Sequence, residues 1–257
     1  MIAAGRSAAD ARSEGSVPSV VKRIAVVILL FWTRQAAADA PSSENVLTRP
    51  HTVAEAEVGA IVLPNAAISP AQKGGNFFVP IGKGDATIMT GLHLLFRGGQ
   101  TWAVGAGALF APHPTSDSGY GLGGATDLPR THSRSYLWIG GEVRYFPIHT
   151  RYFDVWGGVT AGGIIIADRF ANNAAVPVPS ILGVPEVTVS TEGYTIGAQV
   201  GGNWIVTEHI VLGLTFRADL WFLPSTVQCS AFDDCSTLTG KVDAFEMGLT
   251  LAYRIAL

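Results

Sequence analysis

The last thirteen residues alternate between large apolar side chains and small or charged ones. Counting back by twos from the end of the chain gives Leu257, Ile255, Tyr253, Leu251, Leu249, Met247 and Phe245. The positions between them hold alanine, glycine and threonine, together with Glu246 and Arg254. This period of two predicts a β-strand with one apolar face. Because small residues suit the crowded inside of a small barrel, we expect the large ones to face lipid.

The same alternation recurs along the chain and predicts eight strands. They are expected at residues 53–63, 86–97, 101–111, 134–146, 151–167, 193–206, 208–223 and 244–257. Short turns alternate with long connections rich in Pro, Gly, Ser, Asn and Asp, at residues 64–85, 112–133, 168–192 and 224–243. A closed barrel places all the short turns at one end and all the long loops at the other. The predicted fold class is all-β, an eight-stranded antiparallel up-and-down transmembrane β-barrel.

No charged residue falls on the predicted outer band of these strands. The charged residues expected to form a network in the lumen are Glu57, Arg97, Glu142, Arg144, Asp154, Arg217, Asp219, Glu246 and Arg254. A lipid-facing Arg or Lys at mid-bilayer costs about 2–4 kcal/mol, so this sorting is what a bilayer enforces. Buried charges must pair, and an eight-stranded barrel is only wide enough for side chains to fill it. We therefore expect a plug of paired charges rather than an open pore.

Aromatic residues are expected near both ends of the predicted barrel. Phe96, Trp102, Tyr145, Phe153, Trp204 and Tyr253 fall near the short turns, and Phe110, Tyr194, Phe222 and Phe245 near the long loops. Two aromatic girdles are typical of membrane barrels. The alternative is that these rings stabilise strand ends, as in any β protein.

The N-terminal region has the pattern of an export signal. Lys22 and Arg23 precede the apolar residues 24–32, and three alanines end at Ala38. This pattern predicts a signal peptide over residues 1–38, although a short buried core helix is the alternative. Residues 39–52 are then expected to be a periplasmic N-terminal tail, and residues 53–257 the barrel.

Composition and charge narrow the classes of function. Hydrophobic residues make up 48% of the chain and charged residues 14%, yet no apolar run reaches the roughly 20 residues of a membrane-spanning helix. Removing residues 1–38 takes away five of the 17 basic and two of the 20 acidic residues, which leaves a formal charge of −6. A charge of this sign argues against nucleic acid as a partner.

With these features the chain resembles the small eight-stranded outer-membrane barrels of Gram-negative bacteria, of the kind of the OmpA transmembrane domain, OmpX and OmpW. The resemblance covers residues 53–257. It implies contact with outer-membrane lipid and lipopolysaccharide, and insertion by the outer-membrane assembly machinery. In that family the last strand is the assembly signal, which Tyr253, Ile255 and Leu257 match, although the final residue is usually Phe.

Cys229 and Cys235 are the two cysteines of the chain and lie in the last long connection. In an exported protein an isolated pair predicts a disulfide that closes a small loop hairpin. A redox or metal role is disfavoured because no histidine or third cysteine lies nearby in sequence. We expect no metal site and no cofactor.

Two further patterns in the sequence are similar to catalytic or binding motifs. Residues 119–124 match the dinucleotide-binding glycine pattern, but that motif needs a following helix, and Pro129 follows instead. His113, His132 and Ser133 share a predicted loop, and some barrels of the resembled family are lipid A acylases or deacylases that use His and Ser. No acidic orienting partner is evident in the sequence, so we expect solvated loop residues and no catalysis.

The predicted role is therefore structural or interactive, with four long loops at the cell surface. Three alternatives stay open. The first is a narrow channel for small or hydrophobic solutes, and the second is a lipid-modifying enzyme. The third is a soluble periplasmic barrel that binds an apolar ligand, which requires the two strand faces to be inverted.

Overall fold

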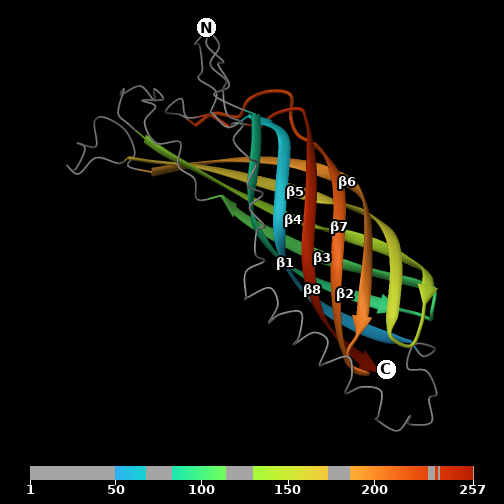
Figure 1. Cartoon of the computed structure of the whole chain (residues 1–257). Coiled ribbons are helices and arrows are strands. Elements are labelled where there is room, and N and C mark those ends of the chain that lie inside the picture. Colours follow the sequence, from blue (N-terminus) through green and yellow to red (C-terminus); the bar gives the residue numbers. More distant parts are fainter. Residues whose placement is uncertain are drawn as a thin grey trace, which may run out of the picture. The chain divides into compact units, whose positions relative to one another are not determined.

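A computed structural model shows a closed β-barrel and describes residues 50–67, 83–113, 130–172, 186–230, 235–236 and 238–256 (Figure 1). The predicted signal peptide and nearly all of the predicted tail lie outside these residues. The strands are β1 (His51–Ala67), β2 (Lys83–Arg97), β3 (Trp102–His113), β4 (Arg130–His149), β5 (Phe153–Asn172), β6 (Glu186–Ile205), β7 (Ile210–Phe222) and β8 (Lys241–Ala256). Each strand pairs with its sequence neighbours, and β1 pairs with β8 to close the barrel. The predicted fold class, an eight-stranded antiparallel barrel, is confirmed.

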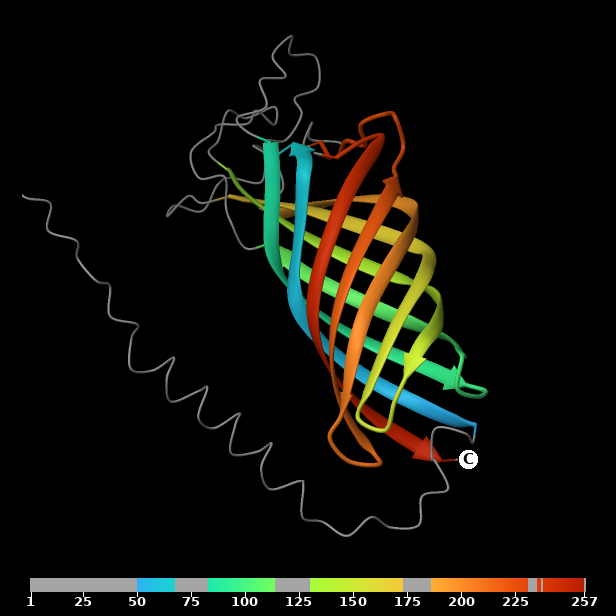
Figure 2. The ribbon, with the colours of Figure 1, turned by 45° about the vertical axis from the view of Figure 1, so that its right-hand side comes forward.

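The loops are sorted between the two ends of the barrel. Short turns join β2 to β3, β4 to β5 and β6 to β7, while β1–β2, β3–β4, β5–β6 and β7–β8 are joined by long connections. Figure 2 shows the three short turns together at one end, beside the end of β8. This arrangement confirms the predicted alternation of short and long connections.

Several strands are longer than predicted. β1 begins at His51, inside the segment expected to be tail, and β4 begins at Arg130 rather than at residue 134. β5 continues to Asn172 and β6 begins at Glu186, whereas the predicted strands ended at residue 167 and began at residue 193. These added segments lack an alternating apolar face. They form strands because they pair with each other, as Ala171 does with Glu186. The periodicity of the sequence does not reveal such pairing.

The outer surface carries an apolar band, which has the same length on four of the strands. In four strands the outward positions are all apolar, over residues 155–165, 194–204, 210–220 and 245–255. At about 3.3 Å per residue each stretch is about 33 Å long. With a strand tilt of about 40° the band is about 25 Å tall, the height found on outer-membrane barrels. No helix among the described residues is long and apolar enough to cross a membrane.

The inner face differs from the prediction in the half of the barrel nearest the long loops. There it carries large apolar side chains rather than only small and charged ones. The buried cluster includes Ile61, Leu63, Met89, Leu109, Tyr136, Trp138, Ile164, Ile166, Trp221 and Val242. A glycine makes room for one of the largest rings, because a Cβ at Gly140 would meet the Trp138 ring. The lumen therefore contains a packed apolar layer.

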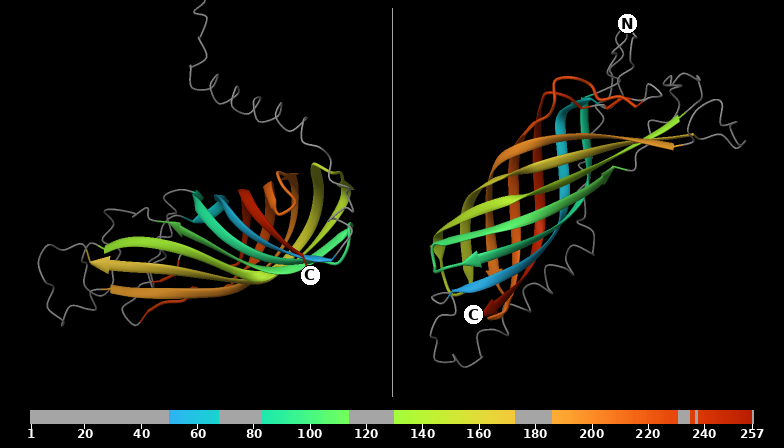
Figure 3. Two further views of the ribbon diagram at one scale, coloured as in Figure 1. Left: turned by 90° about the horizontal axis from the view of Figure 1, so that it is seen from below. Right: turned by 180° about the vertical axis from the view of Figure 1, so that it is seen from behind.

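Strands β4, β5 and β6 continue past the ends of their neighbours at the long-loop end. Pairing of β3 with β4 ends at Arg134, and pairing of β7 with β6 ends at Tyr194. We call the continuing part, residues 130–133, 166–172 and 186–192, the three-stranded extension. Figure 1 shows these yellow-green, yellow and orange strands running beyond the rest of the barrel, and Figure 3 shows the same from behind.

The outer face of the three-stranded extension is polar, unlike the band beside it. Arg169 donates hydrogen bonds of 2.6 and 2.7 Å to the carboxylate of Glu186 across the β5–β6 ladder. These bonds hold the pKa of Glu186 below its ordinary value and raise the pKa of Arg169. The pair is solvent-exposed and lies beyond the apolar stretch of both strands.

Candidate functional site

The middle of the lumen holds a connected charge network, which we call the central network. Its centre is His93 on β2, whose two ring nitrogens contact Glu142 on β4 at 2.7 Å and Glu57 on β1 at 2.9 Å. All three side chains are buried. A Cβ at Gly107 on β3 would collide with the His93 ring, so this glycine gives the imidazole its space.

Arg144 on β4 holds two of the carboxylates in the central network. It donates two hydrogen bonds to Glu55, of 3.0 and 2.9 Å, and one of 2.9 Å to Glu142. Gln199 on β6 donates a further bond of 2.8 Å to Glu142. The guanidinium also lies over the ring of Trp156, 4.1 Å from the ring centre. Glu142 is therefore held by three donors from three strands.

The remaining members of the central network lie on β5, β7 and β8. Arg217 donates a hydrogen bond of 2.8 Å to Glu246, and its guanidinium nitrogen lies 3.9 Å from Glu57. Asp219 accepts a bond of 2.9 Å from the hydroxyl of Thr160. With these contacts the network draws side chains from seven of the eight strands, and β3 contributes the space at Gly107.

A second group of charges lies near the short turns. Asp154 on β5 accepts a hydrogen bond of 2.9 Å from Arg97 and one of 3.4 Å from Arg254. Arg97 also donates to the carbonyl oxygens of Gly99 and Gln100 in the β2–β3 turn, at 3.1 and 2.7 Å. This group holds the β2–β3 turn in place and fills the lumen at the short-turn end. Its contacts join strands that are distant in sequence.

The structure thus places all nine predicted lumen charges inside the barrel, in two groups. Glu57, Glu142, Arg144, Arg217, Asp219 and Glu246 belong to the central network, and Arg97, Asp154 and Arg254 to the group near the turns. A cavity beside Arg97 and Arg144 has a volume of about 20 Å³. That is room for about one water molecule. Side chains fill the lumen at this level.

A third polar cluster, at the long-loop end, was not predicted. His132 contacts Asp168 at 2.7 Å, and Arg134 donates to Asp168 at 3.1 Å and to Asp85 at 3.0 Å. The hydroxyl of Tyr136 donates to the same Asp85 carboxylate. These residues come from β2, β4 and β5. Only the cross-strand register brings them together, so their spacing in the sequence gave no signal.

The prediction for the His and Ser residues is partly wrong. His132 and Ser133 lie on β4, and His113 on β3, rather than in a loop. His132 is buried, stacks on Phe170 and has an acidic partner in Asp168. Because successive residues of a strand point to opposite faces, Ser133 points away from His132. The two cannot act together as a nucleophile and its base.

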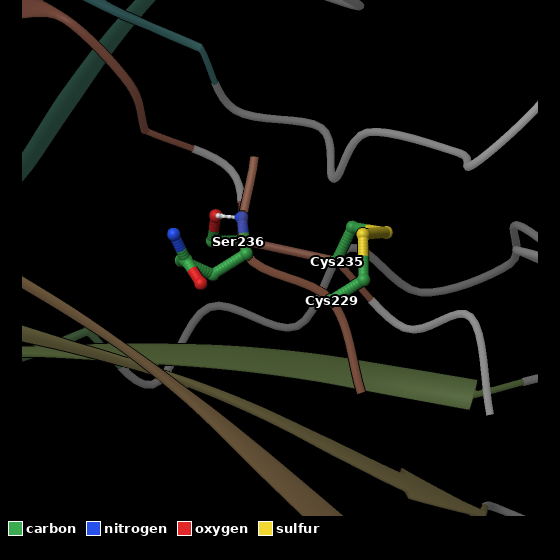
Figure 4. Close-up of a disulfide and its surroundings, with 4 residues drawn as sticks. Cys229, Cys235 and Ser236 are labelled. Carbon is green, nitrogen blue, oxygen red and sulfur yellow. Dashed lines mark hydrogen bonds between the residues drawn. A yellow bond between two sulfur atoms is a disulfide. The ribbon is translucent and has the colours of Figure 1, made fainter. Parts of the chain in front are cut away.

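The predicted disulfide is confirmed. Figure 4 shows Cys229 and Cys235 joined across two segments of the β7–β8 connection. Next to the bond, the Ser236 amide donates to the Gln228 carbonyl at 2.7 Å, and the Gln228 amide donates to the Ser236 hydroxyl at 3.1 Å. Among the described residues, no cluster of His, Cys, Asp and Glu could hold a metal ion.

Two residues of the predicted assembly signal lie on the outer face of β8. Tyr253 and Ile255 are exposed in the apolar band, and Tyr253 stacks on His209 with ring centres 5.6 Å apart. Leu257 lies outside the described residues, as does the glycine-rich segment 119–124. Near the short turns, aromatic residues pair across strands, as Trp102 does with Tyr145 at 4.8 Å between ring centres.

No protein-family model matches this sequence, and no curated protein is similar to it in sequence. Similar solved structures include a major outer membrane protein from Thermus thermophilus, at 14% identity and a TM-score of 0.51, covering 80% of this chain and 99% of that one. The attachment invasion locus protein Ail of Yersinia pestis, at 12% identity and a TM-score of 0.44, covers 81% and 99%. The outer membrane protein OprG from Pseudomonas aeruginosa, at 11% identity and a TM-score of 0.45, covers 82% and 98%. The likeness to the Thermus protein shows the same fold.

Proposed function

We propose that the protein is an outer-membrane barrel with a structural and surface-interaction role, exported by the signal peptide of residues 1–38. The observation that carries this proposal is the contrast between the two sides of the barrel wall. An apolar band of bilayer height covers the outside, while the inside is filled by paired charges and packed apolar side chains. A barrel built in this way holds its place in a membrane and offers its long-loop end to the surroundings.

A filled lumen disfavours the channel. Any ion path must pass both the central network and the apolar layer that begins at Ile61 and Met89. Moving a bare charge through a layer of that kind carries a large desolvation cost. A structural plug accounts for the buried ion pairs without a transport role.

The other two alternatives have less support. A soluble ligand-binding barrel needs an apolar cavity inside and a polar surface, whereas Leu249, Leu251 and many other large apolar residues of this protein are exposed. A lipid-modifying enzyme needs a nucleophile beside its base, and Ser133 and His132 lie on opposite faces of β4. The proposed partners are therefore outer-membrane lipid and lipopolysaccharide along the band. The assembly machinery would recognise Tyr253, Ile255 and Leu257.

The proposed topology places the tail of residues 39–50 and the short turns in the periplasm and the three-stranded extension outside the cell. Both cysteines are in the disulfide, so a single introduced cysteine can report its own location. We expect Ser190→Cys, in the extension, to react with a membrane-impermeant maleimide on whole cells. The matched variant Glu208→Cys, in the β6–β7 turn, should react only after the outer membrane is opened.

The closed barrel itself is tested by a gel of membrane fractions with boiled and unboiled samples. The untagged protein should be found in the outer-membrane fraction and should migrate differently when it is not boiled. A protein that is soluble in the periplasm, with no difference between the two samples, contradicts the proposal. Labelling of Glu208→Cys but not Ser190→Cys on whole cells would reverse the orientation.

A further inference from the structure

One edge of the three-stranded extension carries open hydrogen-bonding groups. β6 pairs with β5 as far as Glu186, but its pairing with β7 ends at Tyr194. Residues 186–192 therefore have a neighbour on one side only. Among the described residues, no backbone hydrogen bond reaches them from the side of β7.

The direction of each backbone group on β6 follows from two hydrogen bonds at its other end. The Ile205 amide donates to Tyr152 on the β5 side, and the Val206 amide donates to Ile210 on the β7 side. Successive residues of an antiparallel strand direct their backbone groups to opposite neighbours. The pairing of β6 with β5 has no bulge, so the alternation runs to the end of the strand. Thr188, Ser190 and Glu192 thus direct their N–H and C=O groups to the open edge.

Among the described residues, this edge lacks several of the features that usually protect an edge strand. Natural sheets protect such strands with proline, lysine, a bulge or a very short length. Residues 186–192 read Glu-Val-Thr-Val-Ser-Thr-Glu, without proline or lysine and with the β-branched residues that favour strands. The edge is as long as an ordinary strand of a globular protein.

Two side chains on the edge indicate what it would bind. Glu192 is exposed, and among the described residues it forms no ion pair, whereas Glu186 is engaged by Arg169. On the inner face, the Thr191 hydroxyl is buried with no hydrogen-bond partner among the described residues. An added strand would bring acceptors within reach of that hydroxyl. A basic residue opposite Glu192 would be favoured, because opposite charges on facing positions stabilise a strand pair.

We propose that the edge of β6 at residues 186–192 binds an extended segment of a partner polypeptide, which adds as a fourth strand and carries a basic residue facing Glu192. This proposal rests on the surface-interaction role proposed above and names the kind of partner. Backbone hydrogen bonds supply the affinity in such strand addition, and alternate side chains supply the specificity. A second copy of this chain is a poorer occupant, because it would bring a second acidic edge against the first.

The test uses the full barrel in lipid nanodiscs and two capped eight-residue peptides of alternating Val and Thr. One peptide has Lys at a central position and the other has Glu there. Backbone amide exchange is measured by NMR without and with peptide. In the free protein, the amides of Thr188, Ser190 and Glu192 should exchange much faster than those of Val187, Val189 and Thr191, which face β5. The Lys peptide should protect them, and the Glu peptide should bind at least fivefold more weakly.

A matched pair of variants locates the binding. Ser190→Pro removes the central donor of the open edge and leaves the β5–β6 ladder intact, since proline is tolerated where the N–H faces solvent. It should weaken binding of the Lys peptide at least tenfold, whereas Ser190→Ala, which keeps the amide, should bind as the wild type does. Glu192→Gln should remove the preference for Lys over Glu. The boiled and unboiled gel samples confirm that each variant is a closed barrel.

Three outcomes would overturn the proposal. The first is slow exchange of the three edge amides in the free protein, which means the edge is already covered. The second is binding that survives Ser190→Pro, and the third is a stable dimer in detergent that Ser190→Pro dissociates. If the whole-cell labelling fails while the peptide results hold, the strand-addition site stands and the proposed location is wrong. If labelling succeeds and peptide binding fails, the proposed location stands and the strand-addition site is wrong.

Discussion

His93 is the residue whose charge state follows most directly from geometry. Each of its ring nitrogens contacts a carboxylate oxygen, of Glu57 on one side and Glu142 on the other. A carboxylate can only accept a hydrogen bond, and a neutral imidazole can donate only one. Both contacts are satisfied together when the ring is doubly protonated, so His93 acts as a buried cation that joins β1, β2 and β4.

The variant His93→Gln should destabilise the barrel. The substitution removes the positive charge and leaves two buried carboxylates short of a partner, a loss that typically costs about 3–5 kcal/mol. The measurement is the free energy of unfolding in urea, with the barrel in lipid vesicles. The control is Arg169→Gln, which breaks an exposed ion pair and should leave the unfolding free energy unchanged. Equal stability of His93→Gln and the wild type contradicts the assignment of the charge.

The carboxylates of the central network are not equivalent. The network has more carboxylates than cations. Its five carboxylates are those of Glu55, Glu57, Glu142, Asp219 and Glu246, and its three cations are Arg144, Arg217 and His93. An uncompensated charge in an enclosed lumen costs several kcal/mol, so we expect the network to hold a further proton. We place it between Asp219 and Glu246, which are diagonal neighbours on the inner face of β7 and β8.

This imbalance predicts opposite results for two isosteric variants. Asp219→Asn should leave the free energy of unfolding unchanged or increase it, because it removes an excess negative charge. Glu142→Gln should lower it by about 3–5 kcal/mol, because His93 and Arg144 each lose the charge of one of their two carboxylate partners. Urea unfolding of the two variants side by side makes the comparison. Similar losses in both would mean that the network holds no excess charge.

At the scale of elements, the β7–β8 connection is stabilised separately from the barrel. The disulfide Cys229–Cys235 lies outside the strands, and the Gln228 and Ser236 contacts next to it are local. The strands on either side are held by their own ladders, from Tyr194↔Phe222 and Phe222↔Lys241 onward. Loss of the disulfide should therefore affect the loop and leave the wall intact.

The double variant Cys229→Ser, Cys235→Ser tests this independence. We expect the closed barrel to migrate on an unboiled gel as the wild type does, and added protease to cut the β7–β8 connection faster. Reduction of the wild type should give the same cleavage pattern. A loss of the gel shift in the double variant would show instead that the barrel needs the disulfide.

The predictable elements are those with one apolar face. β8 alternates from Phe245 onward, so its existence and the direction of its apolar face could be predicted from the sequence alone. In β5 the run Ile164, Ile165, Ile166 is apolar on both faces, which hides the inward Ile164 and Ile166 among outward residues. The apolar layer was missed for this reason. The polar ends of β4 and β6 were missed because only pairing makes them strands.

The charge network also shows what the periodicity of the sequence cannot predict. Periodicity could place Arg144 and Glu142 inside the barrel, because both lie on one face of a single strand. It could not show that Arg144 meets Glu55, which is distant in sequence, nor that His132 meets Asp168. Those contacts depend on the register between strands. The sequence therefore predicted that the nine charges lie inside the barrel but not which of them pair.

At the scale of the whole molecule, the lumen is arranged in layers along the barrel. A charged group at Asp154 lies near the short turns, followed by the central network, the apolar layer, and the cluster around Asp168 at the long-loop end. Every described layer is packed with side chains. Side chains thus fill the described part of the lumen as they fill a protein core.

We accordingly expect the purified barrel to carry no ion current in a planar lipid bilayer. The double variant Trp138→Ala, Trp221→Ala should begin to leak, because it removes the two largest buried rings of the apolar layer. Thr90→Ala, on the outer face, is the control and should stay silent. Steady current steps from the wild type would contradict the packed lumen and favour a channel.

The apolar layer also has an electrical consequence. A membrane acts as an insulator because its middle has a low dielectric constant, and a barrel with a wet lumen short-circuits that insulator. In this barrel a layer of packed apolar side chains lies between the central network and the cluster around Asp168 at the long-loop end. We therefore expect that many copies side by side in a membrane would leave its resistance to protons and salt unchanged.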